Sequence, residues 1–338
     1  MPEGLVVFTE RIEGPVPGLD EELIRRSGGE IRYGRAADEQ ERVRMTAEAD
    51  VIVVGMAPIK REFLAALPRL KGVVRLGIGV DTVDLEAATD FGVVVANVPD
   101  FCSEEVAEHT LALIFAVARK IALADRRTRA GQWVAGMDAL LRPIRRLSGQ
   151  TLGLIGLGKI GRALSRKAQG LGLQVIAHDP HVSAEAAQAA EVPLMNLERM
   201  LPQTDILSLH VPVTPETKGL INARTLGMLK PGAILINAAR GPVVDEVALA
   251  AALASGRLAG AGLDVLQQEP LRLPHPLTQF ENVIFTCHYG SMSEEAYGSL
   301  RRQVSDQAVQ ILRGEFPTNL VNRKVKESPH CRLLRKSK

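Results

Sequence analysis

Three polar side chains follow predicted strands in the second half of the chain, where they could carry out proton transfer. Arg240 comes after the strand AILINAA, Glu269 after GAGLDV, and His288 at the end of VIFTC. The planar guanidinium of arginine can hold a carboxylate and a keto oxygen at once. A carboxylate beside an imidazole fixes its tautomer and favours its protonated form, which can protonate a carbonyl oxygen. Because consecutive strands tend to be neighbours, we expect Glu269 and His288 to meet at one sheet edge.

Each of these residues also has an ordinary structural interpretation. Arg240 could form a surface ion pair, Glu269 could be a solvated loop acid, and His288 could simply end a strand. The glycine-rich loop described next favours the catalytic interpretation of all three together. The weaker histidine candidates are His109, which lies mid-helix, His210, which has no evident acid partner, and His275, which lies in a Pro-rich loop.

The strongest motif is the segment 153–161, GLIGLGKIG, which follows a predicted strand and opens a predicted helix. In this context Gly156 allows a tight turn, Gly158 lets the backbone approach a pyrophosphate, and Gly161 lets helix and strand pack closely. The helix N-terminus would face the phosphates. Asp179 follows the next strand, where a carboxylate can accept both ribose hydroxyls and repel a 2′-phosphate. The motif therefore predicts an NAD site and favours NAD over NADP, and a structural turn without a ligand is the alternative.

Short β-rich runs alternate with helical stretches along the chain, which is typical of an α/β protein. Continuous apolar strands of this kind suit parallel sheets buried on both faces. We therefore predict two doubly wound parallel-sheet domains, a Rossmann domain and a flavodoxin-like domain, with a ligand cleft between them. The predicted strands are Leu5–Thr9, Ile31–Tyr33, Val51–Gly55, Val73–Leu76, Val93–Val98, Thr151–Ile155, Gln174–Ala177, Ile206–His210, Ala233–Asn237, Gly260–Val265 and Val283–Cys287.

Two helical segments and the C-terminal end have clear patterns of their own. A long helix is predicted from Ser103 to Arg129, with Ser103 as its N-cap and acids in its first turn. A final amphipathic helix is predicted over residues 293–313. The end of the chain carries seven Lys and Arg residues and no apolar period, so we expect residues 323–338 to be a mobile basic tail. A nucleic-acid-binding arm is a less favoured interpretation of this tail.

Composition and charge exclude several classes of protein. The chain has 338 residues, which fits two domains, and 41 Lys and Arg against 39 Asp and Glu leave a net charge of only +2. Such a balance gives no overall electrostatic footprint for nucleic acid. No apolar run reaches the roughly 20 residues of a membrane span, and the N-terminus lacks the basic region of a secretory signal. The three scattered cysteines form no CxxC pair, so we expect a cytoplasmic protein without a metal site.

Over roughly residues 50–320 the sequence resembles the D-isomer-specific 2-hydroxyacid dehydrogenase family. Besides the glycine-rich segment, the motifs that carry the resemblance are LGIGVDTVDLEAA (76–88), NVPDFCSEEVAEHTLALIFAVAR (97–119), HVPVTPETKGLI (210–221), LKPGAILINAARGPVVDEVAL (229–249) and LDVLQQEP (263–270). Segment 97–119 is most similar to the branch that contains carboxyl-terminal-binding-protein corepressors. That branch usually has a Trp-Tyr pair after the histidine, and most relatives have Pro before it, whereas this chain has Tyr289-Gly290 and Cys287.

The resemblance implies a role for each site residue. Arg240 is the implied substrate clamp, His288 the proton donor and Glu269 the partner of the histidine. The backbone of Ile78 and Gly79 would receive the substrate carboxylate beside Arg240 and His288. The residues implied to bind the cofactor are Ile155, Gly156, Leu157, Gly158, Lys159, Ile160, Gly161, Asp179, Val211, Pro212, Thr217, Ala238, Ala239, Arg240, Asp264, His288 and Gly290.

The resemblance also implies how the chain is divided. Residues 1–102 and 290–322 would form a discontinuous substrate domain, and residues 103–289 would form the NAD-binding Rossmann domain. The family forms homodimers, and the region 103–150 would lie at the dimer interface.

Together these features predict NAD(H)-dependent interconversion of a small 2-keto acid and its D-2-hydroxy acid. Phosphoglycerate dehydrogenases also resemble this chain, and they hold phosphate with a basic loop after the third strand. Here that loop offers only Lys60 and Arg61, with Met56 early in it, which disfavours phosphoglycerate. The alternatives are an NADH-sensing, corepressor-like binding protein and a dehydrogenase for another small anion.

Overall fold

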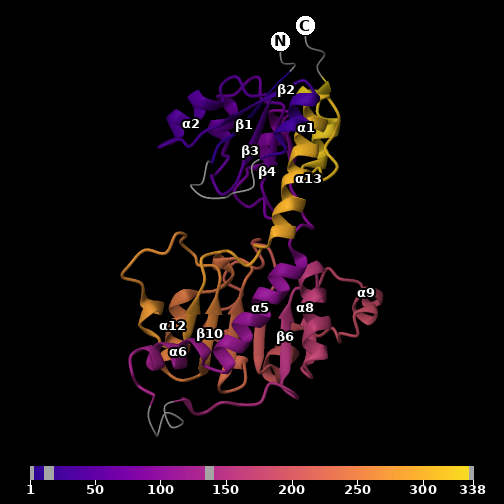
Figure 1. Cartoon of the computed structure of the whole chain (residues 1–338). Helices are drawn as coiled ribbons and strands as arrows, with labels where there is room; N and C mark the ends of the chain where they lie inside the picture. Colours follow the sequence, from indigo (N-terminus) through magenta and orange to yellow (C-terminus); the bar gives the residue numbers. More distant parts are fainter. Residues whose placement is uncertain (1–3, 11–18, 134–140, 335–338) are drawn as a thin grey trace. The chain divides into compact units, whose positions relative to one another are not determined.

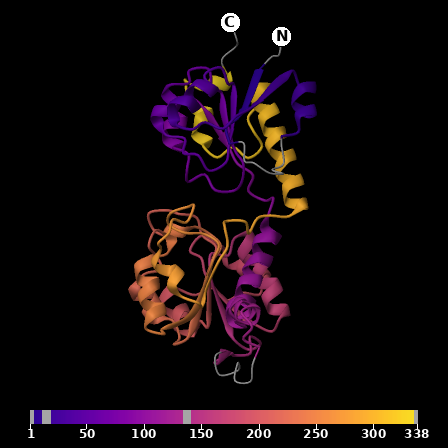
Figure 2. The same ribbon diagram turned by 60° about the vertical axis from the view of Figure 1, so that its left-hand side comes forward.

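The structure, a computed structural model, describes residues 4–10, 19–133 and 141–334. The chain divides into two compact units. The first unit is Met1–Phe101 with Ser293–Lys338, and the second unit is Cys102–Met292. Each unit contains one parallel β-sheet with helices packed on it (Figures 1 and 2). The prediction of two parallel-sheet α/β domains is therefore confirmed.

The first unit has a five-stranded sheet in the order β2-β1-β3-β4-β5, and every neighbouring pair is parallel. Helix α13 comes from the far end of the chain and packs against this sheet, with Val304 and Ala308 in the same apolar cluster as Val6 and Val53. The elements are β1 (Gly4–Phe8), α1 (Glu21–Arg26), β2 (Gly29–Tyr33), α2 (Glu39–Thr46), β3 (Val51–Val54), α3 (Arg61–Ala65), β4 (Gly72–Arg75), α4 (Leu85–Asp90), β5 (Val94–Ala96) and α13 (Glu294–Leu312).

The second unit has a six-stranded parallel sheet in the order β11-β10-β9-β8-β6-β7. The strand order reverses between β6 and β8, so the carboxyl ends of these two strands flank the point where ligands bind in such sheets. The elements are α5 (Ser103–Ala118), α6 (Ile121–Arg129), β6 (Thr151–Ile155), α8 (Lys159–Gly170), β7 (Gln174–His178), α9 (Ala184–Ala189), α10 (Leu197–Met200), β8 (Ile206–Leu209), α11 (Ala223–Met228), β9 (Ala233–Asn237), α12 (Glu246–Ala254), β10 (Leu258–Leu263) and β11 (Val283–Phe285).

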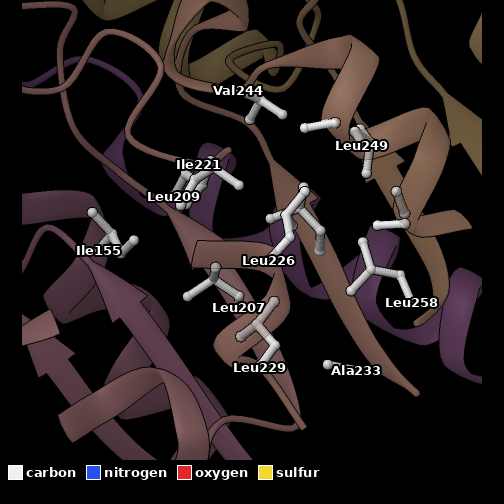
Figure 3. Close-up of a cluster of buried hydrophobic side chains, with 14 of the residues drawn as sticks. Ile155, Leu207, Leu209, Ile221, Leu226, Leu229, Ala233, Val244, Leu249 and Leu258 are labelled. Carbon is white, nitrogen blue, oxygen red and sulfur yellow. The ribbon is translucent and has the colours of Figure 1, made fainter. Parts of the chain in front are cut away.

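Strands of the second unit are buried on both faces, as their continuous apolar runs predict. Along β9, Leu235 joins a cluster with α11 and α12, while Ile234 and Ile236 join the cluster on the opposite face with α5 and α8. Figure 3 shows the first of these clusters, where Leu226 and Leu249 lie with side chains of β8. Both layers hold the strands in place, so the loops at their carboxyl ends start from fixed positions.

The long helix predicted from Ser103 to Arg129 is wrong in two respects. The helix is broken after Ala118, because Lys120 adopts a left-handed conformation with φ of 53° that ends α5 before α6 begins. Cys102, and not Ser103, is the N-cap, and no side chain caps this helix. Among the described residues, no helix combines the length and apolar character of a membrane span.

The predicted mobile tail is also wrong over residues 323–334. This segment forms two short 3₁₀ turns at the end of the first unit (Figure 2). The side chains of Val325, Cys331 and Leu333 are buried. The Arg332 guanidinium donates to the carbonyls of Leu67 and Leu70 at 2.6 and 3.0 Å. The three buried side chains are too widely spaced among charged residues to show as a period. Residues 335–338 lie outside the described residues.

Candidate active site

The structure brings Glu269 and His288 together at the carboxyl edge of the second unit's sheet. The two residues follow the neighbouring strands β10 and β11, and His288 Nδ1 lies 2.6 Å from Glu269 Oε2. The other carboxylate oxygen accepts the backbone N–H of Leu266 at 3.0 Å. Burial acts to raise the pKa of Glu269, but the hydrogen bond and charge of His288 outweigh it, so the pKa lies below its usual value. Glu269 is therefore a carboxylate that holds Nδ1 and leaves Nε2 as the ring nitrogen for a substrate.

The backbone of His288 is held in an unusual conformation. Its φ of 56° is in the left-handed region, which costs free energy for a residue with a Cβ. Its N–H donates to the Asp264 carbonyl at 2.8 Å, and the Asp264 carboxylate accepts the N–H groups of Tyr289 and Gly290 at 3.1 and 3.0 Å. A Cβ on Gly290 would lie 2.9 Å from this carboxylate, so glycine is needed there. Asp264 thus fixes the turn that presents the histidine.

Asp264 is in turn held by two side chains that the sequence analysis did not connect with the site. Thr286 Oγ1 donates to Asp264 Oδ1 at 2.6 Å, and His109 Nε2 on α5 lies 3.1 Å from Thr286 Oγ1 and 3.4 Å from Asp264 Oδ1. Burial alone would raise the pKa of Asp264, but the hydrogen bonds from His109, Thr286 and the Gly290 N–H outweigh it and lower this pKa to about 2. Asp264 is therefore ionised throughout the working range of pH.

Arg240 follows β9 after Ala238 and Ala239, and its backbone is held by Asn237, another residue that the sequence analysis missed. The buried Asn237 side chain donates to the Arg240 carbonyl at 2.9 Å and accepts the Ala239 N–H at 3.1 Å. The guanidinium Nη1 donates to the Ala239 carbonyl at 2.7 Å. The charge of Arg240 also contributes to the lowered pKa of Glu269. A cation, a histidine and its carboxylate partner thus share one edge of the second unit.

The glycine-rich segment has the geometry that a dinucleotide requires. Gly156 has a φ of 96°, and a Cβ there would lie 2.5 Å from the His210 carbonyl oxygen. A Cβ on Gly161 would lie 2.4 Å from the Gly156 carbonyl oxygen, so α8 packs tightly on the loop. At Gly158, the N-cap of α8, a Cβ would meet no atom within 4 Å. A pyrophosphate can therefore approach the open backbone at Gly158 and the N-terminus of α8.

The other residues predicted to hold the cofactor lie along the same edge. Asp179 follows β7, and its carboxylate accepts the N–H groups of Leu157 and His181 at 2.8 and 2.9 Å. Each carboxylate oxygen keeps a second lone pair for a ribose hydroxyl. After β8, Thr217 Oγ1 donates to the Pro212 carbonyl at 2.6 Å and so closes the turn that follows Val211. Lys159 and Ile160 form the first turn of α8, and Ala238 and Ala239 follow β9.

Ile78 and Gly79, the predicted substrate-binding residues, belong to the first unit. They follow β4 in a turn in which Gly77 has a φ of 139°. The Gly77 carbonyl accepts the Val98 N–H at 3.0 Å, and the Ile78 carbonyl accepts the Asn97 side-chain amide at 2.6 Å. The turn is therefore fixed within its own unit, and its role in substrate binding stays a prediction.

The second unit matches the family model described as D-isomer specific 2-hydroxyacid dehydrogenase, NAD binding domain, over residues 111–290. A glyoxylate reductase of Korarchaeum cryptofilum is 38% identical over 268 residues, which cover 79% of this chain and 81% of that protein. The chain belongs to the D-isomer specific 2-hydroxyacid dehydrogenase family. The cofactor of this family's dinucleotide domain is NAD, in agreement with the glycine-rich segment and Asp179.

Other relatives in the 2-hydroxyacid dehydrogenase family differ in length and substrate. D-3-Phosphoglycerate dehydrogenase of Mycobacterium leprae is 40% identical over 294 residues, which cover 87% of this chain and 55% of that protein. The chain spans about half the length of the phosphoglycerate dehydrogenases that it matches. The crystal structure of the TT0316 protein from Thermus thermophilus has a TM-score of 0.85 at 35% identity, covering 94% of this chain and 99% of that one. The closer likeness to the corepressor branch stays a prediction.

His210 is a half-buried histidine beside the glycine loop. His210 follows β8, and its Nε2 lies 2.9 Å from the buried Ser208 hydroxyl. Its buried Nδ1 has no hydrogen-bond partner among the described residues. Burial lowers the pKa of His210 from 6.5 to about 4, because a charged ring there would lose its hydration.

We therefore expect mild acid to destabilise the protein through His210. Between pH about 6.5 and about 4 the unfolded chain binds a proton that the folded chain does not, so the free energy of unfolding falls by up to about 3 kcal/mol as pH drops through this window. His210→Gln should flatten this slope, as measured by urea unfolding at several pH values. His330→Gln, which changes an exposed histidine, is the control. An unchanged slope in His210→Gln would contradict the assignment.

Proposed function

We propose that the chain is an NAD-dependent dehydrogenase that interconverts a small 2-keto acid and its D-2-hydroxy acid. The observation that carries the proposal is the 2.6 Å contact between His288 and Glu269, on the same sheet edge as Arg240 and the open glycine loop. This edge combines a proton donor, a cation for the substrate and a dinucleotide site. Dehydrogenation of a hydroxy acid needs all three.

In the proposed mechanism, bound nicotinamide supplies the hydride chemistry. The Arg240 guanidinium holds the substrate carboxylate and polarises the keto oxygen through its parallel N–H groups. Protonated His288 delivers the proton from Nε2 to the carbonyl oxygen during reduction, and the neutral ring takes it back during oxidation. Glu269 stabilises the imidazolium through Nδ1, as its lowered pKa indicates. Asp264 keeps the histidine turn in place.

The proposed substrate class is a keto acid with a small, uncharged side group, and the loop after β3 supports it. Arg61 forms an ion pair with Asp90 at 2.6 Å and packs over the Phe91 ring, so its charge is directed to the end of α4. The N–H groups of Met56 and Ala57 donate to the Glu10 carboxylate at 2.7 and 2.6 Å. Two backbone N–H donors and the Arg61 charge of this loop are thus already engaged within the first unit.

A substrate panel tests the proposed function. We expect NADH oxidation with at least one of glyoxylate, pyruvate, hydroxypyruvate and phenylpyruvate, and a rate on 3-phosphohydroxypyruvate at least about tenfold lower, because the Met56 and Ala57 N–H groups and the Arg61 charge are already engaged within the first unit. Chiral chromatography of the product should show the D isomer. The His288→Asn variant is the negative control for this assay. A higher rate on the phosphorylated acid would overturn the substrate class. If the protein binds NADH but oxidises it with none of these acids, the proposed activity is overturned.

A further inference from the structure

A third carboxylate–histidine pair of the described residues lies in the second unit, outside the proposed proton transfer. Glu246, the first residue of α12, has Oε2 at 3.3 Å from His275 Nε2. Its Oε1 accepts the backbone N–H of Gln267 at 2.8 Å. The side chains of Glu246 and His275 are only 17 and 18% exposed, so this is a sheltered contact and not a solvated surface pair.

The pair bridges the two ends of the loop that carries Glu269. Gln267 lies just before Glu269, and His275 lies at the end of the loop where the 3₁₀ helix Pro276–Gln279 begins. The residues from 267 to 274 are exposed, so apolar packing holds little of this loop. The Gln267 side chain also donates to the Val244 carbonyl at 2.7 Å. Polar contacts to the start of α12 are therefore what fix the loop.

The hydrogen bonds of His275 define which ring nitrogen faces Glu246. The Leu277 N–H donates to His275 Nδ1 at 3.3 Å, so Nδ1 is an acceptor. The ring proton of the neutral imidazole is then on Nε2, which donates to the Glu246 carboxylate. Because the acceptor is charged, this bond is stronger than one between neutral groups.

The segment 240–246, which includes Glu246, also connects the Glu269 loop to Arg240. Gly241 follows Arg240 directly, and a Cβ on Gly241 would lie 1.9 Å from the carbonyl carbon and oxygen of Leu266. The backbone after Arg240 therefore rests on the backbone before Glu269, and only glycine allows this approach. Leu266 in turn donates its N–H to Glu269 Oε1 at 3.0 Å. Residues 240–246 thus contact the Glu269 loop at Leu266, Gln267 and His275.

We propose that Glu246 and His275 are positioning residues that hold the Glu269 loop. They keep Glu269 in contact with His288 and fix its position relative to Arg240. The proposal rests on the proposed function for its kinetic consequence, but not for the geometry that it predicts. Neither residue touches the reacting atoms. They act through Glu269, and a shift of about 1 Å in that carboxylate is enough to lose its hydrogen bond to the imidazole.

The test follows the titration of His288 by NMR in the full chain, with its ring signals assigned through the His288→Asn variant. In Glu246→Ala and His275→Ala the His288 ring is expected to titrate at least about half a pH unit lower than in the unaltered chain, because it loses a carboxylate that favours its charged form. Glu246→Gln, which keeps an acceptor for the Gln267 N–H, should restore part of the difference. Glu185→Ala removes an acid from the first turn of α9 in the same unit and is the control for helix-end charge.

Kinetics of keto-acid reduction give the second arm. We expect kcat/KM to fall about tenfold in Glu246→Ala, with the alkaline limb of its pH profile at lower pH and with NADH affinity unchanged. The same substitution made in a Glu269→Gln background should have little further effect, because the route through Glu269 is already lost. A full additional loss in that background, or an unmoved His288 titration in both alanine variants, overturns the proposal. If the unaltered chain reduces no keto acid, the proposed function is wrong. The NMR titration of His288 then still tests the positioning role of Glu246 and His275.

Discussion

Replacing His288 with asparagine is expected to lower kcat for keto-acid reduction by about 10³-fold, while the dissociation constant for NADH changes by less than about twofold. Asparagine keeps a polar side chain of similar reach but has no proton to deliver at neutral pH. The loss is therefore confined to the step in which the carbonyl oxygen is protonated. Steady-state rates with the keto acid that is reduced fastest give kcat. The change in fluorescence when NADH is titrated into the protein gives the affinity.

His330→Asn is the matched control for this variant, because His330 is exposed and belongs to the first unit. It should keep full activity. Glu269→Gln, which removes the carboxylate 2.6 Å from His288 Nδ1, should lie between the two. Retention of more than about a tenth of the activity in His288→Asn would show that the proton comes from another group.

Replacing Arg240 with lysine should lower kcat/KM for the keto acid by about 10²-fold even though the charge is kept. A guanidinium presents two parallel N–H groups to a carboxylate or keto oxygen, whereas an ammonium is a point charge on a flexible stem. We expect both a higher KM and a lower kcat, since the proposed contact serves binding and polarisation. Initial rates over a range of keto-acid concentrations separate the two parameters.

Arg240→Ala offers a sharper form of the same experiment, because free guanidinium ion can enter the space left by the side chain. Millimolar guanidinium should restore part of the activity of Arg240→Ala and none of the activity of Arg240→Lys. Arg224→Lys, which alters an exposed arginine paired with Glu198 in the same unit, is the control. Equal activity in Arg240→Lys and the unaltered chain would remove Arg240 from the site.

The sheet-edge site could be predicted from the sequence because parallel strands impose it. Glu269 and His288 follow consecutive strands that became neighbours, and Arg240 follows the strand beside them. The spacing of the glycines also predicts the geometry of the loop. A Cβ on Gly156 or Gly161 would meet backbone atoms, and the space beside Gly158 is open to a ligand.

The supporting contacts could not be predicted in this way. His109 reaches Thr286 across 177 positions of sequence, and Glu246 reaches His275 across 29, so no local pattern marks either pair. The break at Lys120 has no glycine or proline to signal it. A homodimer interface over 103–150 stays a prediction, and residues 134–140 of that region lie outside the described residues.

The interleaving of the two units has a consequence for synthesis on the ribosome. The second unit is one continuous stretch, so it can fold as soon as Met292 has emerged. The first unit cannot, because α13 and the segment 323–334 complete its apolar cluster. Its early strands keep one apolar face uncovered until residues 294–334 have been synthesised. Loss of residues 323–334 should thus leave apolar side chains of the first unit exposed and prone to aggregation, while the dinucleotide domain stays intact.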